Sequence, residues 1–183
     1  MFLIIIGALF LIMAMWIVSI YNTLIHSRSL VNEAWSGIDV QLKRRYDLIP
    51  NLVETVKGYS IHEKGVIEEI VRARAASMGA VEVGQKEKAE YTLTSSLKSL
   101  FALAEQYPNL KANENFLALQ DQLSVIETEL QLARRYYNGS VRQYMVLVMQ
   151  FPSNIIARFF NFASASYFEL SSSEERNTPS VKF

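Results

Sequence analysis

The feature that most constrains this chain is an uninterrupted apolar stretch at its amino terminus. Residues 2–20 read FLIIIGALFLIMAMWIVSI, and Ser19 carries their only polar side chain. A helix of this length extends about 30 Å, which matches the hydrocarbon thickness of a bilayer. We therefore expect residues 1–21 to form a transmembrane anchor that carries a water-facing domain.

A cleaved secretion signal is the alternative interpretation of this stretch. Such a signal begins with a basic segment, has a shorter apolar core and ends in small residues at the cleavage site. Here no charged side chain precedes Arg28, and the large residues Trp16, Ile17 and Ile20 stand near the end of the stretch. The sequence also lacks cysteine, which excludes a lipidated cysteine. A retained, single-pass anchor is favoured.

The basic residues around the stretch predict its orientation. Lys and Arg are absent before it, whereas Arg28, Lys43, Arg44 and Arg45 follow it. Because positive charge tends to remain in the cytoplasm, we expect the domain on the cytoplasmic side of the membrane. Only Arg28 lies close to the stretch, so an external domain is the alternative.

The remainder of the chain predicts an all-α fold. Apolar residues recur at spacings of three and four, which is typical of helices with one buried stripe. The first stripe comprises Val31, Trp35, Ile38, Leu42, Arg45, Ile49, Leu52, Val56 and Tyr59. The second comprises Phe116, Leu119, Leu123, Ile126, Leu130, Ala133, Tyr137, Ser140, Tyr144 and Leu147.

These stripes, with two shorter ones between them, predict four helices. The first continues from the anchor, and the others cover about residues 62–78, 85–107 and 112–150. Short connections favour an elongated antiparallel four-helix bundle over residues 22–162, with coiled-coil-like crossings. Pro50 either kinks the first helix or begins a new one, and the kinked continuation is favoured.

A short apolar helix is expected near residues 153–162. In the antiparallel order the fourth helix returns toward the membrane, so the short helix is a candidate for contact with lipid headgroups. The candidate membrane-interface residues are Ile155, Ile156, Arg158, Phe159 and Phe160. The alternative, which is favoured, is that these phenylalanines close the open end of the bundle. Residues 163–183 are polar and are expected to form a flexible tail.

Two polar clusters interrupt the stripes. Arg45 stands on an apolar face, where a guanidinium either reaches water or pairs with a buried acid. Its candidate partners are Asp47, Glu54, Glu127 and Glu129. The second cluster comprises residues 134–138 on the second stripe. The two clusters either face each other as a recognition patch for a protein or lipid, or fix the register of the helices, and the structural role is favoured. The candidate residues are Arg44, Arg45, Asp47, Pro50, Asn51, Glu54, Arg134, Arg135, Tyr136, Tyr137 and Asn138.

No motif in the sequence specifies a reaction. The 18 basic and 18 acidic side chains cancel, which argues against nucleic acid as a partner. His26 and His62 have no metal-ligand spacing, and the sequence contains neither a cysteine nucleophile nor a phosphate-binding or G-x-S-x-G motif. We therefore expect no enzyme activity, no catalytic or metal-binding residues and no cofactor.

Several segments carry a family resemblance when they are read in order. They are YNTL (21–24), EAWSGIDVQLKRRYDLIPNLVETVKGY (33–59), HEKGVIEEIVRAR (62–74), NFLALQDQLSVIETELQLARRYYNGSVRQY (115–144), FPSNIIARFF (151–160) and YFE (167–169). In this combination the chain resembles the LemA family of bacterial membrane proteins. The resemblance implies an amino-terminal anchor in the bacterial cell membrane and a helical bundle, but no enzyme activity.

The resemblance also bears on partners and topology. Members of the family are often encoded near membrane metalloproteases, which implies a role beside the turnover of membrane proteins. Some members carry a lipoprotein-type cysteine before the Tyr-Asn motif, which would place their domain outside the cytoplasm. This chain departs from that pattern, since it has no cysteine and a full-length apolar stretch.

Two classes of function fit these observations. The first is an anchored interaction or scaffold protein that self-associates and binds membrane proteins such as proteases. The second is a sensor or ligand-binding helical bundle. A sensor needs an output domain across the membrane, and the single residue before the apolar stretch leaves no room for one. The scaffold is therefore favoured.

Overall fold

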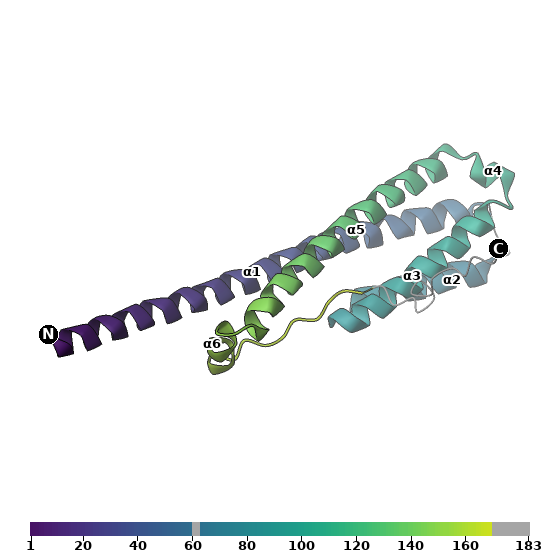
Figure 1. The fold of residues 1–183 in the computed structure, drawn as a ribbon. Coiled ribbons are helices and arrows are strands. Elements are labelled where there is room, and N and C mark those ends of the chain that lie inside the picture. The colour runs from purple at the N-terminus through teal and green to yellow at the C-terminus, as the bar shows by residue number, and fades with distance from the viewer. Residues whose placement is uncertain (60–62, 170–183) are drawn as a thin grey trace, which may run out of the picture. The chain divides into compact units, whose positions relative to one another are not determined.

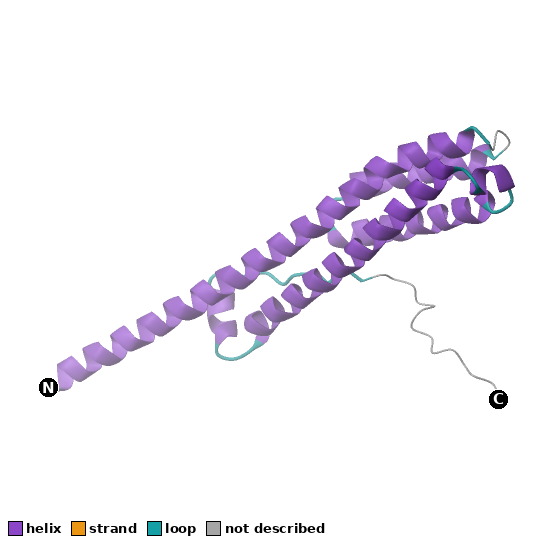
Figure 2. Cartoon of the chain, turned by 90° about the horizontal axis from the view of Figure 1, so that it is seen from above, coloured by secondary structure: helices purple, strands orange, loops and turns teal. Residues whose placement is uncertain are grey.

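The regular structure of the chain is helical throughout the residues that the structure describes. This computed structural model describes residues 1–59 and 63–169 (Figures 1 and 2). In chain order the helices are α1 (Phe2–Lys57), α2 (Lys64–Gly79), α3 (Val83–Ala104), α4 (Pro108–Lys111), α5 (Glu114–Met149) and α6 (Ser153–Phe159). The prediction of an all-α fold is confirmed for this part of the chain.

The first helix, α1, is continuous over 56 residues and joins the apolar stretch to the folded domain (Figure 1). Pro50 lies inside α1, so the alternative of a new helix at this proline is wrong. By length and composition α1 is able to cross a membrane, and 0% of its most apolar 18-residue window is buried. Complete burial begins at Leu24.

The later helices begin and end close to the predicted limits, with one unpredicted element between them. Pro108, which directly follows the predicted helix 85–107, begins the four-residue helix α4. Its fixed φ and missing N–H suit the first turn of a helix. The side chain of Asn113 then caps α5, since Asn113 Oδ1 accepts a hydrogen bond from the backbone N–H of Phe116 at 3.0 Å.

The described residues fall into two compact units, and α1 and α5 each contribute to both. Unit 1 contains Met1–Val40 and Leu130–Tyr167. Among the described residues, unit 2 contains the rest of α1, the chain from there to Glu129, and Phe168 and Glu169. The apolar stretch therefore belongs to unit 1, and α2, α3 and α4 belong to unit 2.

In unit 1 the helices α1 and α5 run antiparallel. Trp35 of α1 contacts Tyr137 of α5 with 5.3 Å between ring centroids. Tyr21, earlier in α1, contacts Phe160, which follows α5, at 4.7 Å. The core between the helices is built from side chains at spacings of three, four and seven, namely Leu24, Val31, Ala34, Ile38, Leu130, Tyr137, Val141 and Tyr144.

In unit 2 the end of α1 and the start of α5 share a core with α2 and α3. The helix α2 packs along α3 (Figure 1), and Phe101 of α3 contacts Phe116 of α5 at 6.1 Å between ring centroids. Fully buried side chains include Leu42, Ile49, Leu52, Val56, Ile70, Leu93, Leu97 and Leu100. Both predicted stripes are thus buried or half-buried, except that Tyr59 is 41% exposed.

The chain after α6 is held against the protein. The hydroxyl of Tyr144 donates to the carbonyl of Ala163 at 2.7 Å, and the hydroxyl of Tyr137 donates to the carbonyl of Ser166 at 2.8 Å. Phe168 is 2% exposed. The predicted flexible tail begins at residue 163, and these contacts hold residues 163–168 against the protein, while the mobility of this segment remains a prediction. The rest of that predicted tail, residues 170–183, lies outside the described residues.

Candidate functional site

Arg45 is a fully buried charged residue in the apolar stripe of α1. It follows Ile38 and Leu42 at spacings of seven and three, so the helix directs its side chain into the core. A buried guanidinium destabilises the fold unless other groups balance its charge and accept its hydrogen bonds. The surroundings of Arg45 balance its charge and accept hydrogen bonds from both terminal nitrogens, whereas its buried Nε has no acceptor among the described residues.

Two carboxylates and one hydroxyl surround the Arg45 guanidinium. Nη1 donates to Glu90 Oε2 on α3 at 2.7 Å. Nη2 lies 2.7 Å from Glu127 Oε1 on α5 and 2.8 Å from Thr94 Oγ1 on α3. Glu90 has no exposed surface, whereas 32% of the Glu127 side chain is exposed. Glu127 was one of the four partners considered from the sequence.

The neighbouring residue, Tyr46, completes the same arrangement. Its hydroxyl donates to the second oxygen of Glu90, Oε1. Consecutive residues of α1 therefore use both oxygens of one buried carboxylate. We name Arg45, Tyr46, Glu90, Thr94 and Glu127 the Arg45 network. It connects α1, α3 and α5 within unit 2, and removing one partner of such a buried pair costs about 3–5 kcal/mol.

Pro50 adds a contact between α1 and α2. A proline inside a helix has no N–H for the carbonyl four residues earlier, which here is that of Tyr46. Arg74 of α2 takes the place of that N–H, since its Nε donates to the Tyr46 carbonyl at 2.8 Å. The proline therefore frees a backbone acceptor that α2 uses, and Pro50 has a structural role in this unit.

The other candidate residues of the first cluster lie on the surface. Asp47 and Glu54 form ion pairs with lysines one turn away on α1, at 2.7 and 2.6 Å. Arg44 donates to a nearby glutamine of α1 at 3.1 Å, and Asn51 is exposed. Exposed pairs of this kind contribute at most about 1 kcal/mol to stability. These four residues are therefore separate from the buried Arg45 network.

The second cluster lies on α5 in unit 1. Tyr137 is 3% exposed and Arg134 is 8% exposed, whereas Arg135 and Tyr136 lie on the surface and Asn138 is half-buried. Burial raises the pKa of Tyr137 above its ordinary value of 10.0, so its hydroxyl remains a neutral donor at neutral pH. Because the two clusters belong to different units, their facing each other remains a prediction.

The short helix α6 differs from the prediction in two ways. Ile156, a candidate membrane-interface residue, is only 7% exposed, because it packs into unit 1 beside the buried Ala157. Phe159 is 78% exposed, so the favoured expectation that it closes the end of the bundle is wrong. Phe162 is the aromatic residue buried at this point, and it contacts Tyr21 at 5.8 Å between ring centroids.

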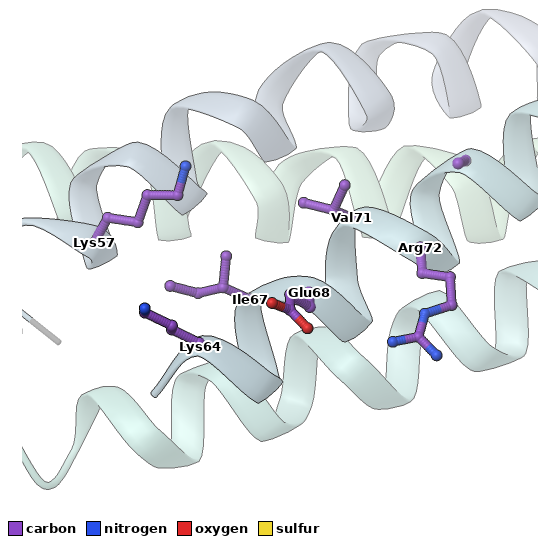
Figure 3. Close-up of a pocket in the computed structure, with 7 residues that line it drawn as sticks. Lys57, Lys64, Ile67, Glu68, Val71 and Arg72 are labelled. Carbon is purple, nitrogen blue, oxygen red and sulfur yellow. The ribbon is translucent and has the colours of Figure 1, made fainter. Parts of the chain in front are cut away.

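An open groove with an apolar floor and charged rim lies along α2. Its volume is about 720 Å³, and it is lined by Lys57, Lys64, Ile67, Glu68, Val71, Arg72 and Ala75. In Figure 3, Ile67 lies between Lys57 of α1 and Lys64 of α2. Lys57 is paired with Glu54 at 2.6 Å, but Lys64 and Arg72 outnumber Glu68, so the rim is positive and suits an anionic amphiphile.

The described ranges contain no cluster of metal-ligand side chains. Among residues 1–59 and 63–169, no group of three or more His, Cys, Asp or Glu side chains is placed to hold a metal ion. His26 is exposed, and His62 lies outside the described residues. The buried charged groups of the Arg45 network bind one another.

Four residues of these contacts were missed from the sequence, namely Tyr46, Arg74, Glu90 and Thr94. Glu90 had a signal, because it precedes Leu93, Leu97 and Leu100 at the spacing of the buried stripe of α3. A carboxylate and an arginine that each interrupt an apolar stripe are natural partners. Arg74 had no such signal, since it binds a backbone oxygen.

Comparison with known proteins relates these features to other chains. The sequence model described as "LemA family" matches residues 34–183. The chain is 24% identical over 157 residues to "Protein LemA" of Metamycoplasma hominis, in an alignment that covers 84% of this chain and 70% of that protein. It is 21% identical over 175 residues to "Magnetosome protein MamQ 2" and "Magnetosome protein MamQ 1" of Paramagnetospirillum magneticum. These alignments cover 81% of this chain, which spans 64% of the length of each magnetosome protein.

Proposed function

We propose, from the premise that this chain belongs to the LemA family, that it is a single-pass scaffold of the bacterial cell membrane. In this proposal α1 crosses the bilayer, and the domain is an antiparallel four-helix bundle on the cytoplasmic side that binds further copies of itself and other membrane proteins. The family match supports the general class. The partners proposed first are membrane proteases and other components of membrane protein turnover.

The observation that carries the proposal is the unburied apolar window of α1, which continues without a break into the folded domain. Covering one large apolar side chain contributes about 1.5–3 kcal/mol. The exposed residues of this window include Ile5, Leu9, Phe10 and Ile12, all more than half exposed. Only a lipid environment or extensive protein contact would cover so many side chains, and the length of the window fits the bilayer.

A binding role rather than a catalytic one is supported by the site. The buried charges of the Arg45 network are used in holding helices together, and neither the family description nor the relatives' names denote an enzyme. On the surface of unit 1, Leu132 and Tyr136 are each 55% exposed and stand one helical turn apart. Together with Leu30 and Tyr167 they line an open groove, which we propose as the surface for a second copy.

The anchor is tested by alkaline carbonate washing of membranes that contain the full-length protein. We expect the protein to remain with the lipid, and its release would contradict the proposal. Protease treatment of intact spheroplasts then tests the side, because a cytoplasmic domain is protected. Digestion of the domain would place it outside.

Self-association is tested by mass photometry of the full-length protein in nanodiscs. Leu132→Glu puts a charge into the proposed surface and is expected to lower the oligomer fraction several-fold. Gln131→Glu places the same charge at the adjacent exposed position and serves as the matched control. A strict monomer in the wild type, together with no enriched neighbours after affinity capture from native membranes, would contradict the scaffold.

A ligand-binding bundle is the second candidate, and the groove along α2 favours it. A fluorescent fatty acid is a suitable probe, because its carboxylate would meet Lys64 while its chain lies on Ile67. Saturable binding that is lost in Lys64→Glu but kept in Lys88→Glu, an exposed lysine of α3, would support this candidate. Absence of saturable binding would favour the scaffold.

A further inference from the structure

We infer that α6 provides a second membrane contact, which lies in the headgroup region of the bilayer that α1 crosses. The surface concerned, named here the α6 membrane face, comprises Phe151, Ile155, Arg158, Phe159 and Phe160. The inference rests on the proposed membrane anchoring of α1. Its partner is lipid, and the contact restrains the domain at a second point.

The α6 membrane face is apolar and uncovered. Phe151 is 75% exposed, Ile155 59%, Phe159 78% and Phe160 46%. The opposite side of the same short helix is fixed in the protein, since Ile156 is 7% exposed and Ala157 is 0% exposed. A helix with one side packed and large apolar side chains on the other has the form of an interfacial helix.

Within unit 1 the α6 membrane face lies beside the end of the apolar stretch. Phe160 contacts Tyr21 with 4.7 Å between ring centroids, and Phe162 contacts the same ring at 5.8 Å. Tyr21 immediately follows Ile20, the last residue of the stretch. If α1 crosses the bilayer, the α6 membrane face therefore lies where α1 leaves the hydrocarbon, which is the depth that aromatic residues prefer.

The charges near this face are basic. Arg158 is exposed on α6, and the guanidinium of Arg28 lies over the Phe162 ring at 5.4 Å from its centroid. Arg28 follows Tyr21 by about 10 Å along α1, and helical side chains lean toward the helix N-terminus, so its guanidinium is directed back toward the headgroup layer, which extends about 5–7.5 Å beyond the hydrocarbon. Neither residues 1–32 nor residues 151–168 contain an acidic side chain. Both guanidinium groups are thus placed for lipid phosphates, with no local carboxylate to compete.

The chain reversal after α6 keeps this face in place. Asn161 has a φ of 55°, a left-handed conformation that asparagine adopts more readily than most residues. The backbone N–H of Phe162 donates to the Ala157 carbonyl at 2.9 Å, and the Phe162 ring returns to the core. A helix of seven residues is too short to be stable alone, so this packing is what presents its apolar side.

The inference is tested by fluorescence quenching with the full-length protein in phosphatidylcholine vesicles, with and without phosphatidylglycerol. Because the chain has no cysteine, one introduced thiol gives a single labelled site. An environment-sensitive dye is attached in Phe159→Cys, in Leu9→Cys within the apolar stretch, and in Tyr136→Cys. Tyr136 is an exposed aromatic residue of α5, also in unit 1, and is the matched control. Lipids carry a quencher either near the headgroup or deep in the acyl chain.

We expect the dye at position 159 to be quenched several-fold more by the shallow quencher than by the deep one. The dye at position 9 should respond to the deep quencher, and the dye at position 136 to neither. Adding Arg158→Gln to Phe159→Cys should weaken the effect of phosphatidylglycerol on the quenching at position 159.

Other outcomes separate this inference from the proposed anchor. If position 9 is quenched while position 159 behaves like position 136, the anchor stands and the second membrane contact does not exist. Energy transfer between labelled copies at position 159 without lipid quenching would assign the face to a second copy and overturn the inference. If position 9 is also unquenched and carbonate releases the protein, the anchor itself fails.

Discussion

The two units of this protein hold their buried polar groups in opposite ways. Unit 2 places the charge of Arg45 between two carboxylates, with distances of 2.7 Å to each. Unit 1 uses the neutral hydroxyls of Tyr137 and Tyr144, and both donate to backbone carbonyls. The central buried contact of unit 2 is an ion-pair network, whereas these two contacts of unit 1 are neutral, although unit 1 also buries Arg134.

The difference has a physical basis in the cost of burying charge. A buried ion loses several kcal/mol of hydration, which only well-placed partners recover, whereas a hydroxyl loses much less. In return, an ion pair fixes helix positions more strictly, because any other register leaves a charge unpaired. Unit 2 aligns parts of α1 and α5 with α2 and α3, besides the short α4, whereas unit 1 aligns mainly α1 and α5. In this protein the buried ion-pair network joins the unit in which more helices meet.

The largest expected effect is the loss of the carboxylate that two α1 residues share. Glu90→Ala leaves the Arg45 guanidinium buried with Glu127 and Thr94 alone and removes the acceptor of Tyr46. We expect the free energy of unfolding to fall by about 3–5 kcal/mol. Chemical denaturation of the full-length protein in detergent, followed by circular dichroism, measures this change.

The control for this substitution is Asp47→Ala, which removes an exposed carboxylate from the same region. Its ion pair with Lys43 is more than half exposed on both sides, so the change should stay within about 0.5 kcal/mol. Equal effects of the two substitutions would show that the Arg45 network does not stabilise unit 2.

A smaller effect is expected where Pro50 and Arg74 cooperate. Arg74→Met leaves the Tyr46 carbonyl without a partner and should lower the free energy of unfolding by about 1.5–3 kcal/mol. In a Pro50→Ala background the restored N–H binds that carbonyl, so the same substitution should cost about 1 kcal/mol less. A double-mutant cycle measures the coupling, and a coupling of zero would refute the role assigned to the proline.

The neutral contacts of unit 1 should contribute less. Tyr137→Phe removes one hydrogen bond to Ser166 and should lower the free energy of unfolding by about 1 kcal/mol. Amide exchange in residues 163–169 should become faster, because this segment loses a fixed point. Tyr136→Phe changes an exposed neighbour and should leave both measurements unaltered. If exchange is equally fast in the wild type, the segment is not held as described.

The smallest effect is a dependence on alkaline pH. Burial raises the pKa of Tyr137 and of Tyr144 above 10.0, although Arg28 opposes the shift at Tyr144. The folded protein therefore retains these protons when the unfolded chain begins to lose them, and stability falls as pH rises above about 10. Denaturation at several pH values should show a shallower fall in the double variant Tyr137→Phe with Tyr144→Phe. An identical slope would contradict the burial of these phenols.

Much of the helical core was predictable because its signal is a simple period. The two long stripes identified the buried faces of α1 and α5, and Arg45 stood out as the charge that interrupts one of them. Glu127 was recognisable as a partner, but Glu90 was missed, although it precedes Leu93 and Leu97 at the spacing of the buried stripe of α3. The same test applied to α3 would have found it.

Two other features were not predictable, because they depend on a backbone atom or on tertiary packing, which the pattern of side chains does not reveal. Arg74 binds a backbone carbonyl that becomes free only when Pro50 is inside α1. The orientation of α6 depends on tertiary packing, which buries Ile156 and Phe162 and leaves Phe159 exposed. Apolar composition alone could not choose between these neighbouring residues.

The contacts that fasten residues 163–166 have a consequence for how this chain varies and how it is trimmed. Tyrosine hydroxyls donate hydrogen bonds to the backbone carbonyls of Ala163 and Ser166. The backbone N–H of Ala165 donates to the sulfur of Met145 at 3.4 Å. On the side of residues 163–166 these bonds use backbone atoms only, so substitution by other small residues would leave the bonds in place. A motif search will pass over such a segment. Truncation after residue 162 would therefore remove a segment that is packed against the rest of the protein.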